Sequence, residues 1–335
     1  MNKLNCSVLD LAIIPDKGGI LDAIKRSSDD AQLLDKLGYS RIWLAEHHNS
    51  DHFGCSATSI LIGHIASITN RIRVGSGGIL LPNHEPLIIA EQFGTLESIF
   101  PNRIDLGLGS SSGSDSIVQS KIKRMNFSSQ EIQIENDIKM IQKYFDKTNR
   151  YSEIRAIPGE GSNIPLWVLG CSIKSARLAG RLGLPYVYGS HIKDDSRIDA
   201  YEGYIKNFRP SYQLDTPYFM ICLNTIIAES HEESVYLSSS WLNMLTGFKA
   251  NRSIPFSAPM EAPLYKDSEI IEASLQPIIQ SALIGTPNEL SQRLVGLTIS
   301  HKFLKEIMVT NYIYDDIKRH KAYELIKETV DKVNI

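Results

Sequence analysis

The chain has 335 residues, of which 42% are hydrophobic and 22% are charged. This length accommodates two ordinary domains or one α/β barrel, and the composition is that of a globular protein with a large core. With 35 Lys and Arg against 38 Asp and Glu, the net charge is −3, and the chain lacks the basic patch that nucleic-acid binding needs.

Short apolar runs typical of strands alternate with amphipathic patterns typical of helices along almost the whole chain. Strands are predicted at 8–14, 41–48, 72–81, 103–110, 164–171, 185–190, 218–228 and 306–314. Helices are predicted at 27–39, 56–70, 86–100, 128–145, 172–183, 195–208, 230–245 and 315–333. The first helix has Ser and Asp capping signals at its start and Gly38 at its end, and the third begins at Pro86.

The alternation of eight strands with eight helices predicts a β/α barrel. Such strands pair in parallel through right-handed crossovers, and eight units in roughly 250 residues or more make a TIM barrel. We predict an α/β fold, a TIM (β/α)8 barrel forming one domain over 1–335, with a doubly wound sheet as the alternative. Insertions precede the fifth strand (146–163) and the eighth (248–275). The second insertion is rich in Pro and Ser, and it is either a lid or a surface excursion.

Glycine and small polar residues follow most predicted strands, and in a barrel the C-terminal strand ends face one pocket. These residues are Glu46, His47, His48, Ser76, Gly77, Gly78, Gly107, Gly109, Ser110, Ser111, Ser112, Gly170, Cys171, Ser172, Gly189, Ser190, His191, Asn224, Thr225, Thr310 and Asn311. Adjacent His47 and His48 would point to opposite faces of a strand, and the chain has neither His-x-His nor His-Glu-x-x-His. The pattern therefore does not predict a metal site.

Two glycine-rich strand ends that run into helices have the form of an anion-binding turn. Backbone N–H groups and a helix N-terminus can hold a phosphate there. In "GCSIKSA", Ser172 would be the N-cap and Ser175 would lie in the first turn, so both hydroxyls would meet a phosphate; helix capping alone is the simpler interpretation. "GLGSSSGSD" differs from the dinucleotide motif Gly-x-Gly-x-x-Gly. The pair Gly77 and Gly78 would let a flat ring approach the backbone, or would form a bulge or turn.

Four segments carry a resemblance to a known family: "RIWLAEHHN", "RIRVGSGGILLPNHEPLIIAEQFGTLESIFPNRIDLGLGSSSGSD", "PLWVLGCSIKSARLAGRLGLPY" and "EIMVTNYIYD". Together they resemble the bacterial luciferase-like flavin monooxygenases, in the subgroup of single-chain oxidoreductases, from the first predicted strand to the last helix. The family fold is a TIM barrel. The resemblance implies reduced FMN (FMNH2) supplied by a separate NAD(P)H:flavin reductase. It also implies that O2 adds to the flavin as a peroxide or hydroperoxide, which oxidises an organic substrate such as an aldehyde.

The resemblance also assigns roles to residues. His47 matches the catalytic histidine beside the flavin, a general base or hydrogen-bond donor. Gly77 and Gly78 match a non-proline cis peptide under the isoalloxazine ring, and Ser172 and Ser175 match phosphate-contacting positions. The expected cofactor-binding residues are Ser76, Gly77, Gly78, Gly109, Ser110, Gly170, Cys171, Ser172 and Ser175. Glu46 and His48 would point away from the flavin and brace the loop, and His84 would be structural or interfacial.

Two positions depart from the family pattern. Ser110 stands where many members have an arginine that helps to hold the phosphate, and a neutral hydrogen bond is weaker than a charge-assisted one. Residues that would compensate are Lys121, Lys123, Arg124 and Lys174. Gly109 stands where luciferase proper has a cysteine, which argues against a light emitter.

The function predicted from these observations is an FMN-dependent monooxygenase that oxidises a small, hydrophobic organic substrate. Apolar residues in the second insertion support the hydrophobic character, namely Ile254, Phe256, Pro259 and Leu264. The alternatives are a deazaflavin-dependent hydride-transfer enzyme and a non-catalytic flavin-binding relative of luciferase. Ser110 in place of arginine keeps the last alternative open.

The remaining expectations concern assembly and compartment. The family commonly dimerises through the helices after strands two and three, here "SILIGHIASI" and "LIIAEQFGTLESIF", so a homodimer is expected. The N-terminus lacks the apolar region and cleavage site of a signal peptide, and no apolar run has the length of a membrane span. Four widely spaced cysteines match no zinc motif and suit a reducing compartment, so we expect a soluble, cytoplasmic protein: Cys6, Cys55, Cys171 and Cys222.

Overall fold

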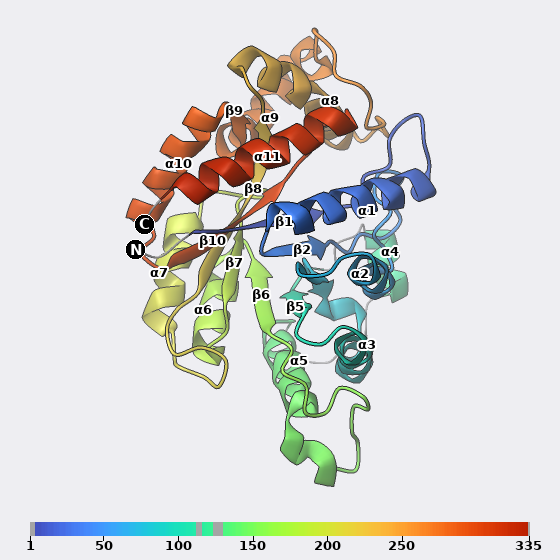
Figure 1. Cartoon of the computed structure of the whole chain (residues 1–335), viewed down its shortest axis with the longest axis vertical. Coiled ribbons are helices and arrows are strands. Elements are labelled where there is room, and N and C mark those ends of the chain that lie inside the picture. Colours follow the sequence, from blue (N-terminus) through green and yellow to red (C-terminus); the bar gives the residue numbers. More distant parts are fainter. Residues whose placement is uncertain (1–3, 112–115, 123–129, 334–335) are drawn as a thin grey trace.

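Eight parallel strands close into a barrel in the computed structural model, which describes residues 4–111, 116–122 and 130–333 (Figure 1). Each barrel strand pairs with the next along the chain, and the last pairs with both the seventh and the first. This closure confirms the predicted TIM barrel, and the doubly wound alternative is wrong because an open sheet would leave two free edges. The barrel strands are β1 (Asn5–Asp10), β2 (Arg41–Leu44), β3 (Arg73–Ser76), β5 (Ile104–Gly109), β6 (Leu166–Gly170), β7 (Tyr186–Gly189), β8 (Phe219–Ile227) and β10 (Leu304–Thr310).

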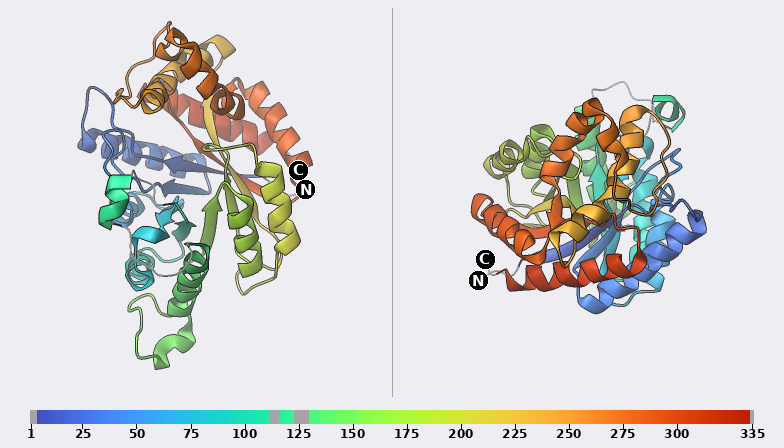
Figure 2. Two further views of the ribbon diagram at one scale, coloured as in Figure 1. Left: turned by 180° about the vertical axis from the view of Figure 1, so that it is seen from behind. Right: turned by 90° about the horizontal axis from the view of Figure 1, so that it is seen from above.

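Helices surround the strands, as the view from above in Figure 2 shows. Their apolar faces pack against the outside of the sheet. The start of β1 lies beside the end of the last helix (Figures 1 and 2). No helix in the described ranges is long and apolar enough to cross a membrane. The helices that follow barrel strands in the chain are α1 (Ile20–Leu37), α2 (Thr58–Ser67), α3 (Pro86–Ile99), α5 (Gln130–Phe145), α6 (Ile173–Leu182), α7 (Arg197–Asn207), α8 (His231–Ala250) and α11 (Asp316–Lys332).

Three helices, one short strand and three 3-10 turns in the described part of the chain were not predicted from the sequence. The strand β9 (Leu283–Gly285) pairs with β8 and extends the sheet beyond the barrel, whereas β4 (Ile79–Leu80), which pairs with β5, falls within the predicted strand 72–81. The others are α4 (Ser116–Ile122), α9 (Glu269–Ser281), α10 (Pro287–Ser300) and the 3-10 turns η1 (Leu81–Asn83), η2 (Lys147–Tyr151) and η3 (Leu264–Asp267). A signal for α10 was present in "TPNE", because Thr286 and Glu289 form a capping box and Pro287 occupies the first turn.

The first helix begins seven residues before its predicted start at Ser27. The Asp22 carboxylate accepts a hydrogen bond from the Gly19 backbone N–H at 2.8 Å, so the cap lies at Gly19, and Ser27 is buried inside the helix. The apolar pattern did not reveal this first turn, because Ile20 and Leu21 are exposed to solvent. The predicted end was right, since Gly38 caps the helix in the left-handed conformation (φ 76°).

Both predicted insertions are present, but the second has different limits. The segment 146–163 separates α5 from β6 and extends from the barrel at the lower end of Figure 1. In the segment 248–275, the first three residues still belong to α8 and the last seven belong to α9. The irregular part is therefore confined to 251–263, followed directly by η3, because α8 and α9 continue further than the Pro- and Ser-rich composition suggested.

The irregular segment 251–263 is fastened to the body of the barrel. Phe256 is 1% exposed, and its carbonyl accepts a hydrogen bond from the Asp16 backbone N–H at 2.9 Å in the loop after β1. The Ser239 hydroxyl of α8 accepts a hydrogen bond from the Met260 backbone N–H at 2.9 Å. These contacts connect the segment to the C-terminal end of the barrel strands. The proposal that this segment acts as a lid remains a prediction.

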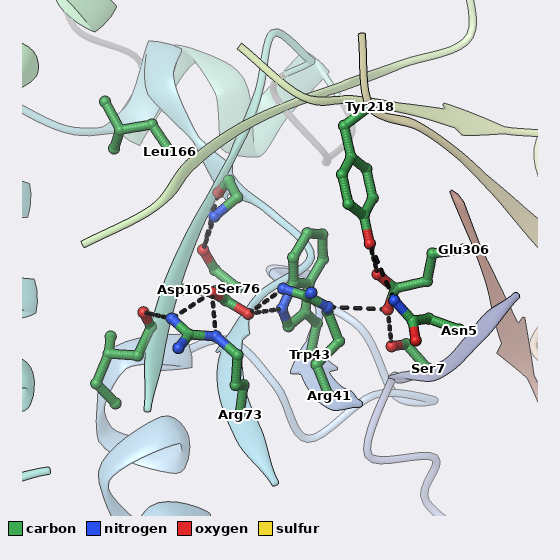
Figure 3. A network of polar contacts seen from close by, with 12 residues as sticks. Asn5, Ser7, Arg41, Trp43, Arg73, Ser76, Asp105, Leu166, Tyr218 and Glu306 are labelled. Carbon is green, nitrogen blue, oxygen red and sulfur yellow. Dashed lines mark hydrogen bonds and ion pairs between the residues drawn. The ribbon is translucent and has the colours of Figure 1, made fainter. Parts of the chain in front are cut away.

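A buried ionic network fills the opposite end of the barrel, where the strands begin (Figure 3). Arg41 donates to the Asp105 carboxylate at 2.7 Å and to the Glu306 carboxylate at 2.9 Å. Arg73 binds the second oxygen of Asp105 at 2.8 Å, and the Tyr218 hydroxyl donates to Glu306 at 2.7 Å. Both carboxylates are completely buried, so their charges depend on these partners. The network connects β2, β3, β5 and β10 and leaves the C-terminal strand ends for a binding site.

Candidate active site

The C-terminal ends of the strands surround a cavity of about 210 Å³. The structure brings together at this cavity eight of the nine residues predicted to bind the cofactor. They are Gly77, Gly78, Gly109, Ser110, Gly170, Cys171, Ser172 and Ser175. The rest of the lining is mainly apolar and includes Leu9, Val187 and Met308. Apolar walls with a few polar groups are typical of a small-molecule site.

Gly77 and Gly78 form a flat wall of the cavity directly after β3. The peptide bond between them is cis, as the resemblance predicts. A Cβ atom on Gly78 would lie 2.8 Å from the carbonyl oxygen of Gly107, and a Cβ on Gly77 would overlap the side chain of Leu9. A side chain at Gly78 would therefore meet backbone, so only glycine fits there, whereas a side chain at Gly77 would force Leu9 to move. Both glycines present bare backbone to the cavity.

Ser76 is the predicted cofactor-binding residue that does not line the cavity. Its hydroxyl donates to the Gly107 carbonyl oxygen at 2.8 Å and accepts from the Gly107 backbone N–H at 3.0 Å. The residue is completely buried, so it joins β3 to β5 beneath the glycine pair. Sequence spacing did not show this orientation, because it depends on where the strand ends inside the closed barrel.

Ser172 and Ser175 lie at the start of α6, where the backbone presents the positive end of the helix dipole. Ser172 is the N-cap, and its hydroxyl accepts a hydrogen bond from the Ser175 backbone N–H at 3.2 Å. The Ser175 hydroxyl is buried 3.0 Å from the hydroxyl of Tyr186 on β7. The capping role is thus present, and the same helix end also faces the cavity.

A second cavity of about 270 Å³ adjoins the first, and the two share Ser110, Leu169, Ser172 and Ser175. Lys174 also lines it, so one of the four cations that would compensate for Ser110 lies at the predicted phosphate position. Lys121 is exposed on α4 and is not among the residues that line either cavity. Lys123 and Arg124 lie outside the described residues.

Glu46 is the centre of a brace between β2 and the loop after β4. Its carboxylate accepts from His84 at 2.8 Å, from His48 at 2.9 Å and from the Leu80 backbone N–H at 3.0 Å. Burial raises the pKa of Glu46, but the hydrogen bond and charge of His84 and the hydrogen bonds from His48 and the Leu80 N–H outweigh burial and hold this pKa below its usual value. Glu46 and His48 therefore brace this loop as expected, and His84, predicted to be structural or interfacial, belongs to the same brace.

His47 does not line the cavity, but it lies near His191, which does. The side chain is half-buried, and its ring contacts the Phe53 ring with centroids 4.8 Å apart. His47 is close enough to His191 to influence its ionisation. The predicted catalytic histidine is therefore at the edge of the site.

His191, two residues beyond the end of β7, lines the cavity; the sequence placed it at a strand end but did not predict it as a catalytic or cofactor-binding residue. Burial lowers its pKa to about 4; contact with the Cys222 carbonyl opposes this shift, and the nearby His47 reinforces it. His191 is consequently neutral at neutral pH. Its place at a strand end was visible in the sequence, but its direction into the cavity was not.

Comparison with known proteins covers the whole fold. The family model described as luciferase-like monooxygenase matches residues 12–298. A luciferase-like monooxygenase of Escherichia coli (strain K12) is 36% identical over 327 residues, which covers 98% of this chain and 97% of the relative. An N-acetyl-S-alkylcysteine monooxygenase of Bacillus subtilis (strain 168) is 26% identical over 335 residues, with 98% of each chain covered.

Several solved structures have the same fold as this chain. Apo-MsnO8 superposes with a TM-score of 0.86 at 26% identity, covering 99% of this chain and 100% of its own. The oxygenating constituent of 3,6-diketocamphane monooxygenase from a Pseudomonas putida plasmid, in complex with FMN, has a TM-score of 0.74 at 16% identity, covering 98% and 97%. An F420-dependent secondary alcohol dehydrogenase has a TM-score of 0.69 at 12% identity, covering 98% and 99%. The last two likenesses show the fold alone.

Proposed function

Because the chain belongs to the luciferase-like monooxygenases, we propose that it uses reduced FMN and O2 to oxidise a small, hydrophobic organic substrate. The observation that carries this proposal is the cavity itself. It combines a bare backbone wall at Gly77 and Gly78 with a helix N-terminus at Ser172, which suits a cofactor made of a flat ring and a phosphate.

The residues present fit FMN. A flat ring needs a surface without side chains, and a Cβ at either glycine would collide with the barrel. A phosphate needs hydrogen-bond donors and positive charge, and the second cavity offers the start of α6 together with Lys174. The two adjoining cavities together reach the volume range of small-molecule sites, roughly 300–1,000 Å³.

When bound, reduced FMN would supply the electrons that activate dioxygen. The chain contributes the surroundings of that chemistry. The apolar lining around Leu9, Val187 and Met308 excludes water from the ring and favours an apolar substrate. His47 would move a proton or donate a hydrogen bond at the edge of the site, which is the most frequent use of an imidazole near neutral pH. Its contact with Phe53 limits the orientations that its ring can take.

The proposal includes a separate NAD(P)H:flavin reductase and a homodimer in the cytoplasm. The outer surfaces of α2 and α3 expose Ile60, Ile88 and Ile99, which is consistent with an interface at these helices. All four cysteines are free, as is usual in a reducing compartment. Sedimentation equilibrium tests the dimer: replacing Ile60 and Ile99 with lysine should yield monomers, and an unchanged mass would contradict this interface.

The test of the proposed function is a stopped-flow experiment. The purified protein is mixed anaerobically with photoreduced FMN and then with O2, and flavin reoxidation is followed by absorbance. We expect reoxidation slower than that of free reduced FMN, followed by oxygen incorporation once aldehydes are added. Reoxidation at the rate of free flavin would contradict the proposal.

Ser110 in place of the family's arginine keeps the non-catalytic alternative open, and the deazaflavin-dependent enzyme is the other alternative. Ser110 lines both cavities, so the presence of serine where many family members have arginine removes a positive charge at the predicted phosphate position. A chain that binds deazaflavin more tightly than FMN and transfers hydride without O2 would support the hydride-transfer alternative. A chain that retains flavin tightly without turnover would support the non-catalytic one.

A further inference from the structure

His191 is anchored by its backbone at the meeting point of three strands. Its N–H donates to the Cys222 carbonyl at 3.0 Å, and its own carbonyl accepts from the Asn224 side chain at 2.9 Å. The Asn224 side chain in turn accepts from the Thr310 hydroxyl at 2.9 Å. Asn224 and Thr310 are buried, so β7, β8 and β10 together fix where the His191 ring can lie.

The imidazole of His191 lies against Gly189 and keeps part of its surface open to the cavity. A Cβ on Gly189 would be only 3.3 Å from the ring carbon Cε1, so this glycine makes room for the ring. The side chain of His191 is half-buried, and the part that remains accessible faces the cavity. The ring is thus held at a wall of the site.

The ring lies near the Cys222 carbonyl, but that oxygen already accepts from the His191 backbone N–H, so the contact gives the ring no partner of its own. Within the described part of the chain, the buried Nδ1 atom has no hydrogen-bond partner. Buried polar atoms in proteins almost always have such a partner, and leaving one without a partner is costly. Because the imidazole is neutral at neutral pH, one ring nitrogen is a donor and the other an acceptor. Such a group suits a heteroaromatic ligand whose edge carries both kinds of atom.

We propose that His191 is a ligand-contacting residue of this site, and that its imidazole exchanges a hydrogen bond with the polar edge of the bound flavin ring. This inference rests on the proposed function, because it needs a flavin seated against Gly77 and Gly78. In barrel order, only β5 and β6 separate β3 from β7. A ring that fills the small cavity against the glycine pair therefore reaches the wall that carries His191.

Two variants separate hydrogen bonding from shape. His191→Phe keeps an aromatic ring without nitrogen atoms, whereas His191→Gln keeps a donor and an acceptor. The matched control is His301→Phe. His301 is also buried and has a ring nitrogen without a described partner, but it lies just before β10, at the other end of the barrel. Thermal unfolding of each variant confirms that it is folded.

The measurements are the Kd of oxidised FMN, by quenching of flavin fluorescence, and the visible absorption spectrum of the bound flavin. His191→Phe should weaken FMN binding about three- to ten-fold, the loss of one net hydrogen bond, and should shift the bound spectrum. His191→Gln should restore most of the affinity, and His301→Phe should change neither quantity. An unchanged Kd and spectrum in His191→Phe would overturn the assignment of His191 alone. Failure of the unmodified protein to bind FMN would overturn the proposed function as well.

Discussion

At the scale of single residues, His47 and His48 are neighbours with different surroundings. His48 donates to the buried Glu46 carboxylate at 2.9 Å, which places it in the brace, whereas the His47 ring contacts Phe53. His47→Ala should lower substrate oxidation roughly 10²- to 10⁴-fold, because a positioned acid or base is lost, while FMN still binds. The measurement is coupled O2 consumption with a reductase present. His48→Gln is the control, and equal rates in wild type and His47→Ala would sink the catalytic role.

Lys174 tests whether the phosphate lies at the start of α6. The side chain lines the second cavity but is exposed, so its contribution is limited by solvent. Lys174→Gln should weaken FMN binding roughly two- to five-fold at low salt, and added salt should reduce the difference. Titration calorimetry would measure this, with riboflavin as the control ligand because it has no phosphate. Equal losses for FMN and riboflavin would show that Lys174 does not meet the phosphate.

At the scale of secondary-structure elements, the Arg41 network holds the strand starts together. Removing Arg41 leaves the buried carboxylates of Asp105 and Glu306 without their shared partner. Arg41→Met should therefore lower the free energy of unfolding by about 3–5 kcal/mol. Urea unfolding measures this loss.

The control for this change is Arg155→Met, which removes the exposed ion pair with Glu160 at 2.7 Å. Exposed pairs contribute about 0–1 kcal/mol, so this variant should unfold almost like the wild type. Similar losses in the two variants would show that burial of the network has no special importance. FMN affinity is the second readout, and Arg41→Met should preserve it because the network lies at the end of the barrel opposite the cavity.

At the scale of the whole molecule, one end of the barrel stabilises the fold and the other end forms the candidate binding site. The ionic network closes the end where strands begin, and both cavities lie where strands finish. FMN at 100 times its Kd should stabilise the folded chain by about 2.7 kcal/mol and raise its melting temperature. Amide hydrogen exchange should slow at the ends of β3, β5 and β6 and at the start of α6. Protection confined to the residues around Arg41 would contradict this division.

Much of the architecture followed from the sequence alone. Eight alternating patterns predicted the barrel, Gly38 and Pro86 marked helix ends correctly, and Gly77 and Gly78 predicted a wall that a ring can approach. These features depend on local chemistry: backbone conformations that favour glycine, the fixed dihedral angle of proline, and hydrophobic periodicity. The first turn of α1 and the helix α9 escaped prediction, because exposed Ile20 and Leu21 and the Pro277 inside α9 obscure the usual pattern.

Only the tertiary structure decided which strand-end residues face the cavity. The sequence placed both Ser76 and His191 among the strand-end residues, yet Ser76 joins β3 to β5 while His191 lines the site. Neighbouring residues of a strand point to opposite sides, so a shift of one residue in a strand's end reverses a side chain's direction. Lys174 and Ser110 meet at one cavity although 64 positions separate them. Such groupings arise when the barrel closes, because closure brings together strand ends that local sequence cannot relate.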